Sequence, residues 1–401
     1  MAGGFALGER LGERLRELRL AQGLSQRGLA EPSYTRSYLS MIEAGKAIPS
    51  EKALRHFADR LSLGDTLRTA LELAHRARHD GELDRAQLAF EEVAVDARTF
   101  ALDEWERAAL CGQGEVAIQA GELATAARLF HEAADVCREV TSLALCGDPV
   151  GAVALGEAAI GEADRGDHAY LARLHAALIM PYTQIGAFGR VSEAAKQALH
   201  LSSRLDDREL LGYVHRAVTH AYIEQKRFSD ALMHAAEALR LCEELGATND
   251  VGLCHLARAS ALKDAERLTE AAAELAIAIE IFEHTHARLY AARATAVLAG
   301  VLVAQGRTDD AWELTRDLLD NNDPWTDGYL HRVAGMSAPD PVDAERHLRR
   351  SADLFKEQGG QIDLVETCRE WGRLLTAQGR LVEAVEVYDL GLRGASTVAQ
   401  A

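Results

Sequence analysis

The sequence predicts an all-α fold, in which a small helical head precedes a long array of helical repeats. Three observations support this prediction. Leu and Ala, both strong helix formers, dominate a chain in which 48% of the residues are apolar. Only 7 of the 401 residues are proline and only 5% are aromatic, which argues against a β-sandwich with many turns. One hexapeptide motif also returns along most of the chain, which is typical of a solenoid.

Helical spacing and capping residues predict five short helices in residues 1–65. Leucines at helical spacing mark the first helix, which ends before Gly23. Ser25 and Thr35 are suitable N-cap residues for the next two helices, and Pro49-Ser50 opens a later one. The apolar residues predicted to form the core of this head are Leu29, Ala30, Leu39, Ile42, Ala53, Leu54, Phe57 and Leu61.

Two short helices joined by a tight turn and braced by others are the layout of a helix-turn-helix. The run Leu24-Ser25-Gln26-Arg27-x-Leu29-Ala30, followed by Thr35-Arg36-Ser37-Tyr38-Leu39-Ser40-x-Ile42-Glu43-x-Gly45-Lys46-x-x-Pro49-Ser50, closely resembles the Cro/repressor (XRE-type) DNA-binding domain over about residues 7–63. Two departures affect the angle at which the recognition helix, the third helix of the head, would approach DNA. The turn at residues 31–34 is one residue shorter than in that family, and Gly28 stands where a helix former is usual.

The resemblance implies a DNA-binding surface on the second and third helices. Gln26 would bond a phosphate, Arg36 would fork onto guanine, and Lys46 would contact the backbone. The alternative is that these are ordinary solvated side chains of a small helical domain. The full implied set is Gln26, Arg27, Thr35, Arg36, Ser37, Tyr38, Ser40 and Lys46.

The charge distribution divides the chain in the same place. Residues 1–65 hold 10 basic and 8 acidic side chains, a net charge of +2, while residues 66–401 hold 34 and 54, a net charge of −20. We therefore expect two domains with different partners, residues 1–65 for DNA and residues 66–401 for another ligand. Because +2 implies modest affinity per head, we expect a homodimer that binds two half-sites of a palindromic, double-stranded operator.

The body repeats a motif in which Gly or a polar substitute precedes an Ala by five residues, as in Gly121-Glu-Leu-Ala-Thr-Ala126. Most intervals between these alanines are 37 to 40 residues, and one further copy is possible near residues 147–152. The pattern closely resembles the tetratricopeptide repeat (TPR) over about residues 66–395, with a period longer than the usual 34 residues. This resemblance implies a right-handed TPR superhelix. The anchor alanines are Ala86, Ala126, Ala194, Ala231, Ala271, Ala311, Ala344 and Ala384.

In the TPR fold the first helix of each pair lines a concave groove. Positions thirteen, ten, six and two residues before the turn are expected to face it, and an extended peptide would need the polar and aromatic residues found there. The alternative for each residue is an ordinary surface or interhelix position. The predicted ligand-binding residues are Tyr213, Arg216, His220, Glu224, Lys263 (beside Asp264) and Arg293, with Arg369 and Arg373 as a matching pair at the C-terminal end.

No constellation of catalytic residues is visible in the sequence, so we expect neither an enzyme nor a bound cofactor or metal. Gly112-Gln-Gly114-Glu-Val-Ala117 matches a dinucleotide-binding fingerprint but lies within a predicted helix rather than after a strand. Six cysteines without metal-like spacing, no signal peptide and no long apolar run predict a soluble, cytoplasmic protein that does not enter a membrane.

This combination of domains resembles the peptide-pheromone-sensing regulators of Gram-positive bacteria, which act in quorum sensing. The resemblance implies a sequence-specific transcriptional regulator whose TPR domain senses a peptide or small molecule and thereby controls operator binding. It also implies the switch, in which the ligand changes the superhelix pitch and repositions the two heads. Two alternatives stay open. The array could be an interaction scaffold that is tethered to DNA and recruits a protein partner, or the chain could be a helical adaptor that binds no DNA.

Overall fold

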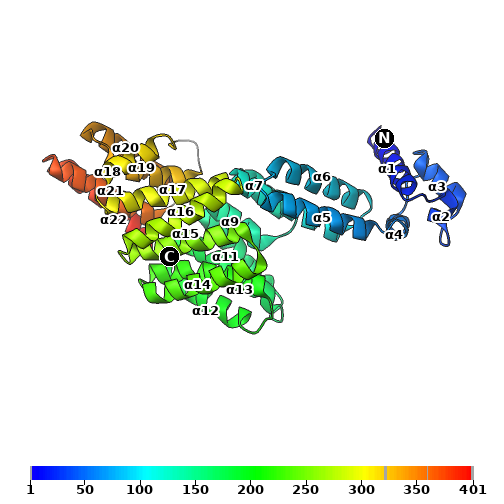
Figure 1. Ribbon diagram of the computed structural model, residues 1–401, viewed down its shortest axis with the longest axis horizontal. Coiled ribbons are helices and arrows are strands. Elements are labelled where there is room, and N and C mark those ends of the chain that lie inside the picture. The colour runs from blue at the N-terminus through cyan, green and yellow to red at the C-terminus, as the bar shows by residue number, and fades with distance from the viewer. Residues whose placement is uncertain (1, 320–322, 359, 399–401) are drawn as a thin grey trace. The chain divides into compact units, whose positions relative to one another are not determined.

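The computed structural model describes residues 2–319, 323–358 and 360–398. Within these ranges the chain forms 22 α-helices and no β-strand, so the predicted all-α fold with a helical head and a repeat array is confirmed (Figure 1). None of the helices in the described part of the chain is both long enough and apolar enough to cross a membrane.

Five helices contribute to the head region, as predicted, but the fifth begins only at Leu63 and continues past residue 65 to His79. Three of them begin at side chains that cap backbone N–H groups: Ser25 accepts a hydrogen bond at 2.9 Å, Thr35 at 3.2 Å and Ser50 at 3.3 Å. Leu15, Leu29, Leu39, Ile42 and Phe57 are fully buried and form the core of the head. The helices are α1 (Ala2–Ala21), α2 (Gln26–Ala30), α3 (Arg36–Glu43), α4 (Glu51–Arg60) and α5 (Leu63–His79).

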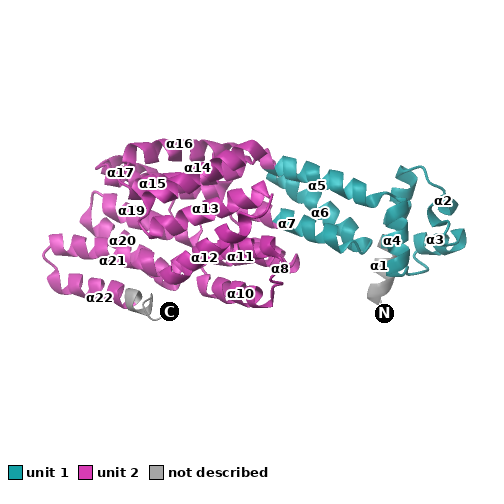
Figure 2. Ribbon diagram, turned by 90° about the horizontal axis from the view of Figure 1, so that it is seen from below, with its two compact units in different colours: residues 1–78, 83–113 teal, residues 79–82, 114–401 magenta. Residues whose placement is uncertain are grey.

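The chain divides into two compact units, residues 1–78 with 83–113 and residues 79–82 with 114–401 (Figure 2). The predicted boundary at residue 65 lies inside α5, and the first unit also contains α6 (Leu83–Thr99). Within this unit, Arg14 of α1 donates hydrogen bonds of 2.8 and 2.7 Å to both carboxylate oxygens of Asp96 on α6. The head and the first repeat helices are thus joined by the ion pair of Arg14 with Asp96 as well as by α5. The functional division into residues 1–65 and 66–401 remains a prediction.

Helical hairpins follow one another from α5 onward, and their second helices begin at the predicted motifs. Each of the eight anchor alanines is buried. In six of these copies the turn residue has a left-handed backbone conformation, as at Gly121 with φ +87° and at Lys226 with φ +56°. The remaining helices are α7 (Asp103–Ala120), α8 (Leu123–Glu132), α9 (Val136–Leu145), α10 (Pro149–Glu162), α11 (His168–Gln184), α12 (Phe188–Ser202), α13 (Arg208–Glu224), α14 (Phe228–Leu245), α15 (Thr248–Asp264), α16 (Leu268–His284), α17 (Arg288–Ala304), α18 (Thr308–Arg316), α19 (Pro324–Ser337), α20 (Pro341–Glu357), α21 (Gln361–Ala377) and α22 (Leu381–Val398).

Of two predicted repeat copies, one is confirmed and one was placed at the wrong residues. The further copy expected near residues 147–152 is present, because Gly147 has φ +86° and precedes α10. The copy read as residues 189–194 was placed three residues too late. Its turn residue is Gly186, with φ +73°, whereas Gly189 lies inside α12. Ala194 is nevertheless buried, because a shift of three residues stays on nearly the same face of a helix.

The glycines of the dinucleotide-like motif are packing residues on α7. A Cβ atom at Gly112 would lie 2.3 Å from the ring of Phe90, and a Cβ atom at Gly114 would lie 2.6 Å from the ring of Phe130. Both rings are fully buried. The motif therefore admits large side chains of neighbouring helices and does not form a phosphate-binding turn.

Gly252 on α15 has the same role, and replacing it by Ala is expected to destabilise the body by about 1–3 kcal/mol. Its Cβ would lie 2.6 Å from the ring of Phe282, which is fully buried and has no room to move. Gly212 occupies the equivalent position of α13, where a Cβ would make ordinary contacts at 3.5 Å. Gly212→Ala should therefore leave stability unchanged or raise it. Urea unfolding of both variants measures the difference, and equal effects would contradict the packing argument.

Contacts within the second unit also join helices that are far apart in the sequence. Leu123, Leu145 and Leu289 form one buried apolar cluster. A Cβ atom at Gly147 would lie 3.1 Å from Gln358, which ends α20. The hairpins at the start of this unit therefore contact later ones directly and not only through their sequence neighbours.

A histidine pair links α13 to α14, since the Nδ1 atoms of His215 and His234 are 2.8 Å apart and His234 stacks on Tyr222. Burial lowers the pKa of both histidines below the ordinary 6.5. The unfolded chain therefore binds more protons, so stability should be complete above about pH 6.5 and fall as the pH drops below it. The expected result is a pH-dependent free energy of unfolding whose slope weakens in His215→Asn/His234→Asn. The exposed His200→Asn should keep the full slope.

Candidate functional site

The exposed face of α3 presents polar side chains and one large apolar side chain. At 3.6 residues per turn, positions 36, 37, 40, 41 and 44 share one face, and all five are exposed. Leu39 and Ile42 lie on the opposite face and are fully buried. The face contains Arg36, Ser37 and Ser40, three of the predicted DNA-binding residues.

A buried ion pair holds α3 against α1 and α2. Arg19 donates hydrogen bonds of 2.6 and 2.9 Å to the two oxygens of Glu43. The side-chain amide of Gln26 donates to Glu43 at 2.9 Å. Burial opposes ionisation of Glu43, but the hydrogen bonds from Arg19 and Gln26 outweigh it and hold the pKa of this carboxyl below its ordinary value. The angle between the helices is thus set by charge as well as by apolar packing.

The other predicted DNA-binding residues differ in how far they are already engaged. Gln26 is tied to Glu43, and Thr35 caps α3 with its hydroxyl oxygen. Arg27 forms an exposed ion pair of 2.6 Å with Glu31, and Tyr38 is half-buried. Within the described ranges Arg36 and Lys46 have no ion-pair partner, and both are exposed. These two cations are therefore available to an external anion.

Sequence reasoning missed Met41, whose side chain is 45% exposed on the same face of α3. If the predicted residues of this face read DNA bases, an apolar side chain among them would suit a thymine methyl group. The signal was present in the helical spacing from Ser37, but an apolar residue in a helix is normally assigned to the core.

The predicted groove residues of α13 lie on one face and have different environments. The Arg216 guanidinium lies 5.6 Å from the ring centre of Tyr213, and its Nη2 is 3.5 Å from Asp250 on α15. The side chain of His220 is exposed on this face, but the surrounding helices exclude much of the bulk water near it. This desolvation, and then the positive charge of Arg216, lower the pKa of His220 to about 4, so the ring is neutral at physiological pH.

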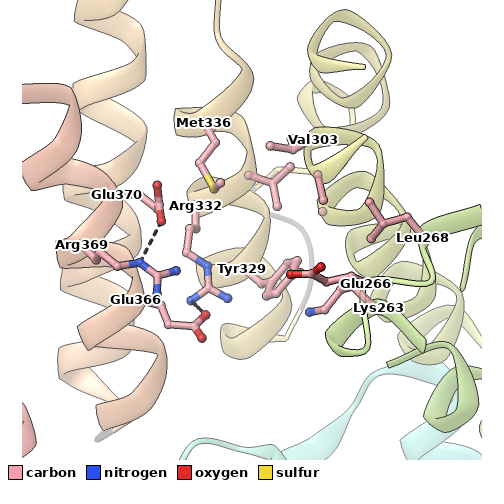
Figure 3. Close-up of a pocket in the computed structure, with 13 residues that line it drawn as sticks. Lys263, Glu266, Leu268, Val303, Tyr329, Arg332, Met336, Glu366, Arg369 and Glu370 are labelled. Carbon is pink, nitrogen blue, oxygen red and sulfur yellow. Dashed lines mark hydrogen bonds and ion pairs between the residues drawn. The ribbon is translucent and has the colours of Figure 1, made fainter. Parts of the chain in front are cut away.

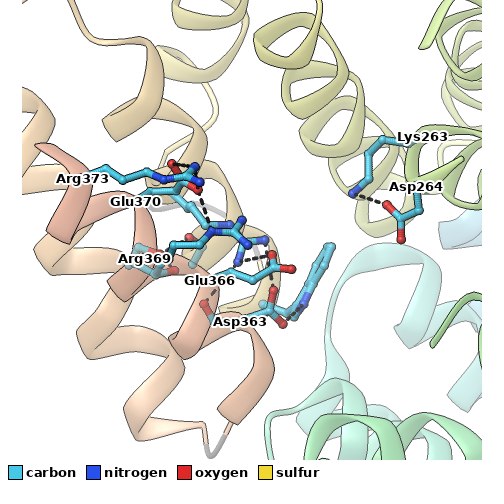
Figure 4. Close-up of polar contacts among 12 residues, drawn as sticks. Lys263, Asp264, Asp363, Glu366, Arg369, Glu370 and Arg373 are labelled. Carbon is cyan, nitrogen blue, oxygen red and sulfur yellow. Dashed lines mark hydrogen bonds and ion pairs between the residues drawn. The ribbon is translucent and has the colours of Figure 1, made fainter. Parts of the chain in front are cut away.

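Acidic side chains collect at the C-terminal end of the same face. Partial burial, and then the negative charges of Asp264, Asp363 and Glu366, together raise the pKa of Glu224 to about 7. Figure 4 shows Lys263 and Asp264 of α15 opposite Asp363 and Glu366 of α21. The structure therefore brings α13, α15 and α21 around one charged region, as expected for the inner side of a superhelix.

Arg293 is engaged within the protein. Its Nη2 and Nε donate hydrogen bonds of 2.6 and 3.2 Å to Asp323, and its guanidinium lies over the ring of Trp325. Asp323 also caps α19. The structure thus gives Arg293 a part in positioning α19, and its contact with a ligand stays a prediction.

A pocket of about 580 Å³ opens between α15, α17, α19 and α21 (Figure 3). Among the six groove residues first predicted, Lys263 lines it, and so does Arg369 of the C-terminal pair. Its most buried charged residue is Arg332, which contacts Glu366 at 3.1 Å and stacks on Tyr329 at 4.7 Å. The other lining residues are Glu266, Leu268, Gly300, Val303, Ala304, Val333, Met336 and Glu370.

Sequence reasoning missed Tyr329 and Arg332, because the repeat that contains them is degenerate and its turn lacks the glycine that sets the register. The pocket combines apolar side chains with charges of both signs, which suits non-covalent binding of a peptide or an amphipathic small molecule. No group of three metal-ligating side chains occurs in the described part of the chain.

Comparisons with known proteins agree with this architecture. A family model described as a helix-turn-helix domain matches residues 10–71. No curated protein matches the sequence. A crystal structure of a Rap protein complexed with competence and sporulation factor is 13% identical, with a TM-score of 0.57, and the match covers 84% of this chain and 99% of that one.

Two further solved structures are similar over most of their length. The Rap conjugation gene regulator of plasmid pLS20 in complex with the Phr* peptide is 12% identical, with a TM-score of 0.48 and coverage of 99% and 96%. PlcR of Bacillus thuringiensis, in complex with the peptide PapR7 and DNA, is 15% identical, with a TM-score of 0.35 and coverage of 71% and 99%. Residues 10–71 are therefore a helix-turn-helix domain, and the chain has the helical-repeat fold of the Rap proteins.

Proposed function

We propose that this protein is a sequence-specific DNA-binding transcriptional regulator whose repeat array senses a peptide or small molecule and controls operator binding. The observation that supports it best is the exposed face of α3, where Arg36 has no ion-pair partner among the described residues. A helix-turn-helix places this face in the major groove. The pocket between α15 and α21 supports the sensing part, as does the ligand named with the Rap crystal structure.

The proposal includes a cytoplasmic homodimer on a palindromic operator. One head has a net charge of only +2, so two heads on adjacent half-sites supply the affinity that one lacks. The body acts by binding and has no catalytic role, cofactor or metal. The ion pair between Arg14 and Asp96 supports coupling, because movement of α6 is passed on to α1.

Selection of binding sites from random DNA duplexes tests DNA recognition. Arg36→Ala should lower discrimination at one base position in each half-site by about 1–3 kcal/mol. Arg55→Ala is the matched control, because Arg55 is an exposed cation on α4 that pairs with Glu51. Its selected sequence should equal that of the unaltered protein. An unchanged base preference in Arg36→Ala would remove Arg36 from the recognition surface.

One observation favours the alternative, an interaction scaffold tethered to DNA that recruits a protein partner. Four large apolar side chains in the described part of α22 are exposed, Leu381, Val382, Val385 and Leu392. Exposed apolar patches often mark protein interfaces. The two functions are distinguished by operator affinity with and without a bound ligand. A ligand-dependent change supports the sensor, and equal affinity supports the scaffold.

A further inference from the structure

The cations on the inner side of the array differ in how many of their donors are used. A guanidinium has five N–H donors, and a buried one is normally satisfied by carboxylates or carbonyls. Arg293 is paired through two nitrogens with Asp323. Arg332 contacts Asp363 and Glu366, each at 3.1 Å. Both are complete without a ligand.

Arg216 is not. Its nearest carboxylate oxygen, on Asp250, is 3.5 Å from Nη2, too far for a good hydrogen bond. Its Nε atom is shielded from solvent and has no hydrogen-bond partner. The side chain is held in place by Tyr213, whose ring centre is 5.6 Å away. A positioned guanidinium with unused donors is the arrangement expected before an anion binds.

The carboxylate of Asp250 lies beside Arg216, but its side chain is 48% exposed, so solvent and salt screen its charge from an anion bound at the guanidinium. Tyr290, on α17, lies close enough to interact electrostatically with Arg216. His220, on the same face, is neutral at physiological pH. The acidic cluster begins further along, at Glu224, and would repel an anion placed there.

We propose that Arg216 anchors a carboxylate of the ligand, through two parallel hydrogen bonds and beside the ring of Tyr213. This inference rests on the proposed sensing function and specifies its chemistry. The planar fork of arginine matches the two oxygens of a carboxylate. A peptide with a free C-terminus supplies such a group, and so does an organic acid.

Affinity selection tests the assignment without DNA. The full chain is mixed with a hexapeptide library that has free C-terminal carboxylates, and retained peptides are identified by mass spectrometry after gel filtration. Retained peptides should bind about 10- to 100-fold more weakly when their C-terminus is amidated, and equally more weakly to Arg216→Gln. Arg208→Gln is the matched control, because Arg208 is an exposed cation on the same helix.

Side-chain carboxylates and organic acids are separated by further arms. Retained peptides that tolerate amidation but require an internal Asp or Glu would still support the carboxylate if Arg216→Gln loses them. If no peptide is retained, succinate would support the carboxylate assignment by raising the Tm of the unaltered protein but not that of Arg216→Gln. Binding to Arg216→Gln as strong as to the unaltered protein overturns the proposal, as does an absence of selective binding in every arm.

Stability gives a second readout. Arg216→Met in the ligand-free chain should leave the Tm unchanged or raise it, because no native hydrogen bond is lost. Arg293→Met should lower the Tm, because it strands the buried Asp323. An equal loss of Tm in both variants would make Arg216 a structural residue and overturn the assignment. Carboxylate binding without any effect on operator affinity would instead contradict the proposed regulatory function and leave the Arg216 site standing.

Discussion

Glu43→Ala is expected to unfold the head while the repeat array stays folded. The change leaves Arg19 as a buried, unpaired cation, since the side chains of Arg19 and Glu43 are only 8% and 5% exposed. It also removes the partner of Gln26. Breaking a buried ion pair from one side costs about 3–5 kcal/mol, which is a large part of the stability of a small domain. Hydrogen exchange measured by mass spectrometry would show loss of protection in α1 to α4.

The control for this change is Glu51→Ala, which removes an exposed partner of Arg55 on α4. Its cost should not exceed about 1 kcal/mol. The pKa of Glu43 is lowered in the folded head, so its contribution should be complete above about pH 4.5 and disappear as the pH falls through the folded pKa. Protection of the head that persists in Glu43→Ala would show that apolar packing alone sets the helix angles.

Arg332→Ala is expected to produce a comparable loss in the body. Arg332 is 6% exposed and pairs with Asp363 and Glu366, whose side chains are 23% and 46% exposed, so its removal leaves two neighbouring carboxylates without their cation. Its stacking on Tyr329 and Phe355 is lost as well. We expect a cost of about 3–5 kcal/mol, seen as a lower urea midpoint for the second unit.

Arg346→Ala serves as the control, because Arg346 is an exposed cation on α20 that pairs with Asp343. It should change the midpoint little. If Arg332→Ala unfolds at the same urea concentration as the control, the carboxylates must relax into solvent. The pocket would then be held by its apolar walls. If a folded Arg332→Ala still binds the retained peptides, the apolar walls of the pocket hold the ligand. If it does not, the charge of Arg332 is required.

The features predicted correctly from the sequence are those whose physical cause is local. A cap is decided within one turn of helix, so Ser25 and Thr35 could be placed from their neighbours alone. The anchor alanines could be placed because each must be small where two helices meet, whatever the rest of the array does. The repeat that contains Ala194 was misplaced because Gly186 and Gly189 are both glycines near a helix start, and only the backbone conformation separates them.

The features that were missed depend on residues distant in the sequence. Glu43 was part of a family motif, but its pairing with Arg19 follows from how α1 crosses α3. The spacing rule placed Arg293 on the inner face, but no local pattern indicates that Asp323 occupies its guanidinium. Side chains of one helix face could thus be assigned to the groove in advance, whereas their availability to a ligand depends on partners from other hairpins.

The contacts of Leu145 with Leu289 and of Gly147 with Gln358 change how the array can come apart. A chain of repeats that touch only their neighbours can fray from either end, one hairpin at a time. Here the loss of an early hairpin also strips partners from a much later one, so the second unit should melt as a block. The same contacts also restrain changes in the pitch of the repeat array. A ligand that stretches or tightens the coil must work against all of them together, which favours two discrete forms over a gradual change in pitch.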